Sequence, residues 1–107
     1  MEDAVGPILC MSDGVDLVVQ AILDDNPDRE VEVVDRGSYV RVQARGSLRL
    51  TRASLQRQLG SSFQMRQFEA MLSSFAGRIQ TATDEITWTL SIEAERAGTQ
   101  PQQERLA

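Results

Sequence analysis

The 107-residue sequence predicts an α+β domain of two consecutive βαββ units, in which two small packed sheets and two helices share one core. Short segments with an apolar residue at every second position indicate strands, and two segments with helical spacing indicate helices. The order strand–helix–strand–strand occurs at residues 5–44 and again at 47–92, so we expect one domain at residues 1–92. Residues 93–107 are polar and without periodicity, which predicts a disordered C-terminal tail.

The first unit begins with an apolar run at Ile8–Met11, which we interpret as a strand. Ser12–Gly14 then offers side-chain oxygens for a helix N-cap. Residues 15–22 carry valine and isoleucine at positions i, i+3, i+4 and i+7, the spacing of a buried helical stripe. This helix should end before Pro27, because the residue that precedes a proline avoids the α conformation.

Two alternating segments follow and predict a hairpin. Glu30–Val34 places Val31 and Val33 on one face, and Tyr39–Ala44 alternates in the same way. The turn signal Asp35–Ser38 lies between the two segments. An antiparallel pair with this alternation buries one face and leaves the other in water.

The second unit starts with a short strand at Leu48–Leu50. Thr51 is a typical N-cap residue for a helix at Arg52–Leu59. Gly60 follows at the position where many helices end with a left-handed residue. This helix is therefore delimited by a signal at each end.

The rest of the second unit reads as strands and one loop. Phe63–Leu72 alternates but changes parity, which predicts a strand with a bulge or bend near Arg66–Gln67. Ser73–Gly77 is interpreted as a loop because most of its residues are small. Arg78–Thr81 and Glu85–Ile92 predict a last hairpin.

The composition excludes most catalytic chemistry. The sequence has no histidine and one cysteine, Cys10, so it can form no histidine base, histidine metal site or internal disulfide. We identify no catalytic, cofactor-binding or metal-binding residue. Cys10 and Trp88 are expected to be buried side chains of the core.

Charge and hydropathy argue against two classes of partner, nucleic acids and membranes. The formal net charge of −5 argues against nucleic acid, whose phosphates require a basic protein surface. No apolar run approaches the roughly 20 residues of a membrane-spanning helix. The acidic start Met1–Asp3 differs from the basic start of a signal peptide, so we expect a cytoplasmic protein with no membrane partner.

Ser73–Gly77 also combines an aromatic residue, Phe75, with small neighbours. Such a segment can anchor a partner protein, because small side chains let the partner's backbone approach closely. Alternatively, it is a tight bend whose Phe75 turns back into the core. The residues themselves leave both interpretations open.

Two charged groups also have two interpretations each. Asp24, Asp25 and Asp28 offer oxygen ligands for a divalent cation, but their spacing differs from an EF-hand loop and is typical of a helix-terminal turn. A basic stretch is either a patch for an acidic protein face or a solvated sheet face balanced by Glu30 and Glu32 across the hairpin. The basic stretch consists of Arg41, Arg45, Arg49, Arg52 and Arg57.

Several short motifs occur in a recognisable order between residues 5 and 90. They are Val5–Ile8, Asp25–Asp28, Val31–Val33, Asp35–Val42, Leu48–Arg52, Leu59–Phe63 and Ser73–Ile79. No single motif is specific, but together they resemble the effector proteins of soluble multicomponent diiron monooxygenases (the MmoB/DmpM family). The chain looks closest to the toluene, phenol and alkene branches of that family.

The resemblance implies a non-catalytic effector, also called a coupling or regulatory protein, that binds the hydroxylase component above its diiron site. Such proteins carry no cofactor; they promote oxygen activation, couple electron use to hydroxylation and control substrate access. Competition with the ferredoxin or reductase for the hydroxylase stays open, as does the alternative of a small ligand-binding or adaptor domain unrelated to oxygenases. The residues that the resemblance places at the hydroxylase interface are Met71, Leu72, Ser73, Ser74, Phe75, Ala76, Gly77 and Arg78.

Overall fold

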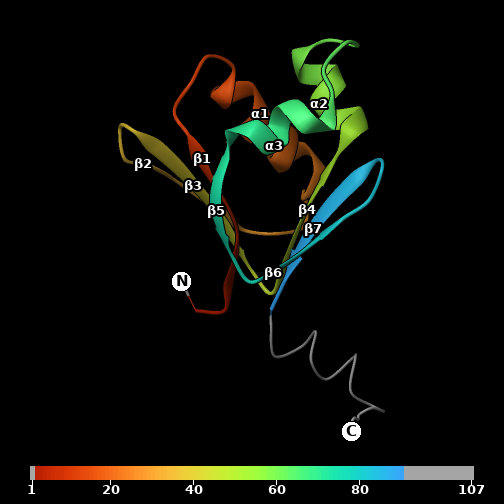
Figure 1. Ribbon diagram of the computed structural model, residues 1–107. Coiled ribbons are helices and arrows are strands. Elements are labelled where there is room, and N and C mark those ends of the chain that lie inside the picture. Colours follow the sequence, from red (N-terminus) through yellow and green to blue (C-terminus); the bar gives the residue numbers. More distant parts are fainter. Residues whose placement is uncertain (1, 91–107) are drawn as a thin grey trace, which may run out of the picture.

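Two antiparallel sheets and three helices make up the structure, a computed structural model that describes residues 2–90. The first sheet has the order β2-β3-β1-β5 and the second the order β4-β7-β6. The sheets diverge from a common end, and the helices lie between them (Figure 1). The strands are β1 (Ala4–Cys10), β2 (Val31–Asp35), β3 (Tyr39–Arg45), β4 (Ser47–Thr51), β5 (Leu72–Ala76), β6 (Arg78–Thr81) and β7 (Glu85–Thr89). The helices are α1 (Val15–Asp25), α2 (Arg52–Leu59) and α3 (Met65–Met71).

The predicted α+β class with two sheets is confirmed. Both predicted hairpins form, β2 with β3 and β6 with β7, and α1 and α2 begin and end close to their expected residues. The first strand is longer than expected, since it begins at Ala4 rather than Ile8. The predicted tail at residues 93–107 lies outside the described residues. Within residues 2–90, no helix has both the length and the apolar character needed to cross a bilayer.

The core lies between the sheets, where apolar side chains from both sheets and from the helices pack together. Phe68 and Trp88 are fully buried and meet edge to face, with their ring centroids 6.3 Å apart. Val15, Val18 and Ile22 form the buried stripe expected for α1. The prediction that Trp88 is a core residue is also confirmed.

The interpretation of residues 63–72 as a bulged strand was wrong, because residues 65–71 form the helix α3. Phe68 is three residues from both Met65 and Met71, so the segment also has helical spacing, and the short alternation misled the prediction. The helix start is stabilised by Gln67, whose side-chain oxygen accepts a hydrogen bond from the Gln64 N–H at 2.8 Å. The fully buried Phe68 then fixes α3 on the core.

Residues 73–76 were also predicted wrongly, as part of a loop. They belong to β5, which pairs with β1 in the first sheet. The partner residues of Ser74–Ala76 lie more than 60 positions away in the sequence, at Gly6–Ile8. Non-local pairing of this kind leaves little local signal in a segment of serine, phenylalanine and alanine.

Three smaller expectations differ from the structure. No side chain of Ser12–Gly14 caps α1. The N-cap residue is Gly14, which has a left-handed conformation with φ +87°. Gly60 ends α2 as expected, but with φ +113° and ψ 154° rather than left-handed helical angles. Val33 was placed on the buried face and is 42% exposed, although it pairs with the buried Val42. The cause is its position on β2, an edge strand that has a neighbour on one side only.

The end of α1 is bonded to β4 through the side chain of Asn26, which is only 7% exposed. Its Nδ2 donates to the carbonyl oxygens of Ile22 and Arg49, each at 2.7 Å. Its Oδ1 accepts from the Arg49 N–H at 3.1 Å. The amide therefore bonds to both backbone groups of Arg49, as a neighbouring strand would, and this satisfies a polar side chain in the interior.

The adjacent carboxylate of Asp25 joins α1 to the start of α2. It accepts hydrogen bonds from the Thr51 N–H at 2.7 Å, from the Thr51 hydroxyl at 3.0 Å and from the Ser54 hydroxyl at 2.6 Å. Thr51 is at the same time the predicted N-cap of α2, because its Oγ1 accepts from the Ser54 N–H at 3.2 Å. We call Asp25 and Asn26, with these bonds, the α1 clamp.

The chain passes from the first sheet to the second at Gly46, between β3 and β4, and again at Gly77, between β5 and β6 (Figure 1). Gly77 has φ +91°, a conformation that L side chains rarely adopt. A Cβ at this position would lie 2.6 Å from the Thr89 carbonyl oxygen and 2.6 Å from Cγ1 of Val5. Only glycine lets the crossing approach β1 and β7 this closely.

We expect Asp25→Ala to lower the free energy of unfolding by about 2–4 kcal/mol, because Thr51 and Ser54 lose a charged acceptor. Asp24→Ala is the matched control, since Asp24 is exposed and accepts hydrogen bonds only from Gln20 and Gln58 among the described residues. Its effect should be much smaller. Urea denaturation of both variants measures the difference, and equal losses would contradict the role of the clamp.

Gly77→Ala should destabilise the protein by about 1–3 kcal/mol more than Gly37→Ala. Both glycines have a positive φ, +91° and +87°, so the backbone strain of the substitution is matched. Only Gly77 has atoms within contact distance of the added Cβ, whereas nothing lies within 4 Å at Gly37. Thermal or urea unfolding gives the comparison. Similar stabilities of the two variants would show that the crossing is not closely packed.

Candidate functional site

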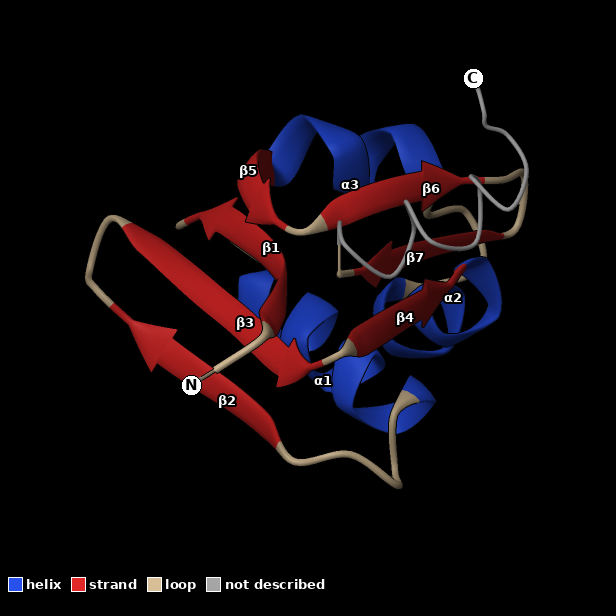
Figure 2. Ribbon diagram, turned by 90° about the horizontal axis from the view of Figure 1, so that it is seen from below, coloured by secondary structure: helices blue, strands red, loops and turns tan. Residues whose placement is uncertain are grey.

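The predicted contact segment, residues 71–78, runs from the last residue of α3 along β5 to the first residue of β6. The strand β5 is an edge strand of the first sheet, and β6 is an edge strand of the second. The segment therefore runs along one edge of the first sheet and then along one edge of the second. Figure 2 shows β6 following β5. Regular strands hold most of it, so its side chains have defined directions.

Exposure divides the contact segment into two parts. Met71 and Leu72 are partly buried and pack against the core, so they fix the start of the segment on the domain. The next three residues are exposed, and Phe75 among them is 39% exposed. The alternative in which Phe75 fills the core is therefore wrong. Ala76 is partly buried, and Gly77 and Arg78 are exposed.

The register with β1 sets the direction of each side chain. Phe75 is opposite Pro7, which lies on the buried side of the sheet, whereas Ser74 is opposite Ile8. Residues opposite one another in an antiparallel pair share a face, so Phe75 points to the helix side and Ser74 to the outer side. Ser73 is the extra residue of a bulge, because Ile8 pairs with Ser74 and the next residue of β1 pairs with Leu72. Phe75 stays accessible because it lies at the open edge.

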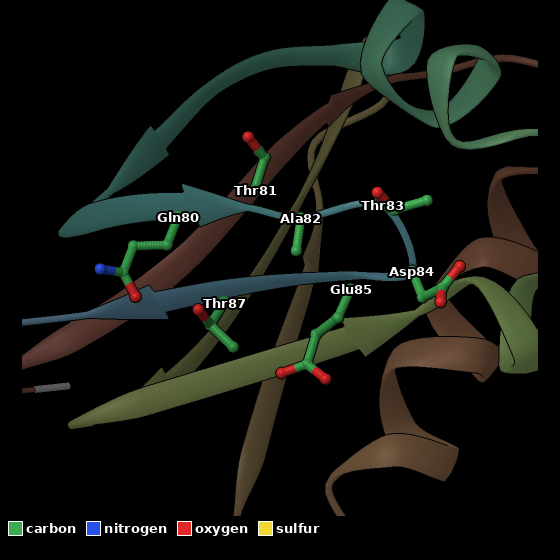
Figure 3. A pocket seen from close by; sticks show the side chains of 7 residues that line it. All are labelled: Gln80, Thr81, Ala82, Thr83, Asp84, Glu85 and Thr87. Carbon is green, nitrogen blue, oxygen red and sulfur yellow. The ribbon is translucent and has the colours of Figure 1, made fainter.

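A hollow of about 800 Å³ lies against the hairpin of β6 and β7 (Figure 3). Its side chains are mostly hydroxyls, an amide and carboxylates, with one alanine. Small-molecule sites usually have predominantly apolar walls with a few polar groups, and this hollow lacks such walls. The lining residues are Gln80, Thr81, Ala82, Thr83, Asp84, Glu85 and Thr87.

The acidic group at the end of α1 has a structural role. Asp25 accepts hydrogen bonds from Thr51 and Ser54 in the clamp. Hydrogen bonds from the side chains of Gln20 and Gln58 lower the pKa of the Asp24 carboxyl below its ordinary value. Among the described residues, no three acidic or cysteine side chains gather in a way that could hold a metal ion. Asp24 and Asp25 therefore bond mainly to residues of β4 and α2, and the interpretation as a local helix-terminal turn was wrong for them.

The arginines of the basic stretch form no ion pair with Glu30 or Glu32 among the described residues. Glu32 is opposite Gln43 and Arg41 is opposite Val34, whereas Glu30 and Arg45 line one hollow with Asp28 and Arg29. Within residues 2–90, two arginines of the basic stretch form ion pairs with acidic residues of the last hairpin. They are Arg49 with Glu85 at 3.4 Å and Arg52 with Asp84 at 2.8 Å.

The sequence prediction did not identify two exposed apolar side chains, and it placed one exposed cysteine in the core. Cys10 is exposed rather than buried, because it lies at the last position of β1, opposite Tyr39. Met11 and Leu17 are 39% and 42% exposed. Leu17 lies two residues after Val15, off the buried stripe of α1, and this spacing is the signal that could have identified it.

Comparison with known proteins identifies the relatives of this chain. The family model of the MmoB/DmpM family matches residues 3–89. The effector subunit of the alkene monooxygenase system of Xanthobacter autotrophicus (strain Py2) is 44% identical over 87 residues. That match covers 81% of this chain and 86% of the relative.

Solved structures share the fold. A chain from a phenol hydroxylase–regulatory protein complex superposes with a TM-score of 0.70 at 22% identity, covering 82% of this chain and 99% of that one. The regulatory protein B of soluble methane monooxygenase gives a TM-score of 0.64 at 26% identity, covering 97% of this chain and 74% of that one.

The family model covers most of the described residues, and the alkene monooxygenase effector matches over most of both chains. Effector proteins of this family are non-catalytic regulatory components. The chain belongs to the MmoB/DmpM family and is a regulatory subunit of a multicomponent monooxygenase.

Proposed function

We propose that this protein binds the hydroxylase component of a bacterial diiron monooxygenase over the diiron site, and that binding promotes oxygen activation, coupling of electron use to hydroxylation, and controlled substrate access. The observation that carries the proposal is the 44% identity to an alkene monooxygenase effector subunit over most of both chains. An alkene is accordingly the first substrate to test. The metal and the reacting atoms belong to the hydroxylase in this proposal.

A regulatory subunit without reactive groups acts only through binding. It changes the state of its partner if it binds two conformations of that partner with different affinity. The effector therefore needs a surface of fixed shape, and its own side chains need no unusual chemistry. Strand β5 supplies such a surface, because residues 72–76 are held in the first sheet rather than in a loop.

The contact segment is the surface that we propose for the hydroxylase. Its exposed Phe75 lies among small side chains, so a partner can approach the backbone and cover the ring. Aromatic side chains in this setting contribute much of the binding free energy at protein interfaces. Met71 and Leu72 pack against the core beside it, so the segment is fixed before the partner binds.

Adding the purified protein to the cognate hydroxylase, ferredoxin and reductase should raise product yield per electron consumed and lower hydrogen peroxide release, until both saturate. Alkene oxidation measured by gas chromatography, with peroxide measured in parallel, gives the result. An unrelated acidic protein of similar size should have no effect. If yield and peroxide release do not change with this protein, the proposed function is wrong.

Phe75→Ala should weaken binding to the hydroxylase by about tenfold or more while leaving the fold intact, because Phe75 is exposed at an edge strand. Val33→Ala is the matched control, since Val33 is 42% exposed on β2, the edge strand at the other side of the same sheet. Isothermal titration calorimetry gives both dissociation constants, and circular dichroism checks folding. Unchanged affinity of folded Phe75→Ala would remove Phe75 from the interface.

A further inference from the structure

The outer face of the first sheet is not covered by any helix within residues 2–90. All three helices lie on the other side, between the two sheets, and Figure 2 shows the strands β1, β2 and β3 in front of them. The register of the strands gives the residues of this face. They are Glu32 and Val34 on β2, Tyr39, Arg41, Gln43 and Arg45 on β3, Ala4, Ile8 and Cys10 on β1, and Ser74 and Ala76 on β5.

One row crosses the whole sheet through the middle of this face. Arg41 is opposite Val34 on one side and opposite Ile8 on the other, and Ile8 is in turn opposite Ser74. Val34, Arg41 and Ile8 are each partly buried. The guanidinium of Arg41 therefore has apolar residues as its neighbours on both adjacent strands. No ion pair or side-chain hydrogen bond of Arg41 is formed with any described residue.

The second sheet differs in just this respect. On its outer face, Arg49 of β4 lies 3.4 Å from Glu85 of β7, so its charge has a partner within the chain. The opposite residues Ser47 and Thr89 are hydroxylic, and large apolar side chains such as Trp88 point inward. The central row of the first outer face thus combines an unpaired cation with apolar residues, whereas the central arginine of the second outer face has an acidic partner and hydroxylic neighbours.

The contact segment is continuous with the first face. Ser74 is opposite Ile8 and Ala76 is opposite Gly6, so two residues of the segment lie on the outer face of the first sheet. A partner strand added to the free edge of β5 would fit less well, because the bulge at Ser73 interrupts the edge. A partner that binds the contact segment is therefore expected to contact the outer face of the sheet rather than to pair with the edge of β5.

We infer that the outer face of the first sheet is a docking surface for the hydroxylase, and that Arg41 forms an ion pair there with a hydroxylase carboxylate surrounded by apolar side chains. This inference rests on the proposed function. The charge of Arg41 supports an acidic contact on the partner, because no described residue forms an ion pair with it. Arginine at the centre of an interface commonly contributes a large share of the binding free energy.

The test compares Arg41→Gln with Arg49→Gln, which remove the same charge from the central part of the two outer faces. Titration calorimetry with the cognate hydroxylase should show a dissociation constant raised by about thirtyfold for Arg41→Gln. Arg49→Gln should change it by less than about threefold, because it removes only an exposed pair within the chain. Arg41→Glu should weaken binding further, by adding repulsion from the partner's carboxylate.

The possible outcomes separate the inference from the function on which it rests. A wild-type protein that binds the hydroxylase, together with a folded Arg41→Gln variant of equal affinity, overturns the docking face and leaves the proposed function intact. A larger loss for Arg49→Gln than for Arg41→Gln also overturns it and points to the second sheet. A wild-type protein with no affinity for the hydroxylase contradicts the proposed function itself. Circular dichroism of each variant shows whether a loss of binding comes from unfolding.

Discussion

The α1 clamp is the set of hydrogen bonds that joins the first half of the chain to the second, because it fixes the end of α1 to β4 and α2. Asn26 bonds to both backbone groups of Arg49, and Asp25 accepts hydrogen bonds from Thr51 and Ser54. These residues belong to β4 and α2, so the end of one helix fixes the first strand of the second sheet and the helix that follows it. Two adjacent side chains thereby connect the halves of the chain, and because Asn26 is buried, losing a partner would leave its amide unsatisfied.

The crossing at Gly77 connects the two sheets, and it determines which side chains the contact segment exposes. Because β5 joins β1 and β6 joins β7, the segment is supported by both sheets at once. Its side chains then divide between two directions, with Phe75 toward the open edge and Ser74 toward the outer face. A partner bound at this place would touch groups whose positions are set by sheet pairing, so little conformational entropy would be lost on binding.

How much of this was predictable from the sequence depends on whether the signal was local. The helix caps at Thr51 and the stop at Pro27 involve neighbouring residues, and α2 and α1 were predicted well. In contrast, α3 and β5 were missed, since the alternation over residues 63–72 fits two periods and β5 pairs with distant residues. The bonds of Asp25 reach Thr51 and Ser54, 26 and 29 positions away, which no turn pattern reveals. The composition excluded most catalytic chemistry without identifying a partner, and the motif resemblance supplied one.

The regulatory role of the protein and the rigidity of its surface can be explained together. An effector that binds one conformation of its partner more tightly needs a surface that does not adapt equally well to both conformations. A loop would adapt, whereas a strand fixed by pairing and by the packed residues Met71 and Leu72 would not. An arginine held between two apolar residues of one row would add a charge requirement to that shape requirement. Discrimination between two states of a partner then follows from rigidity and charge placement, and no reactive side chain is needed.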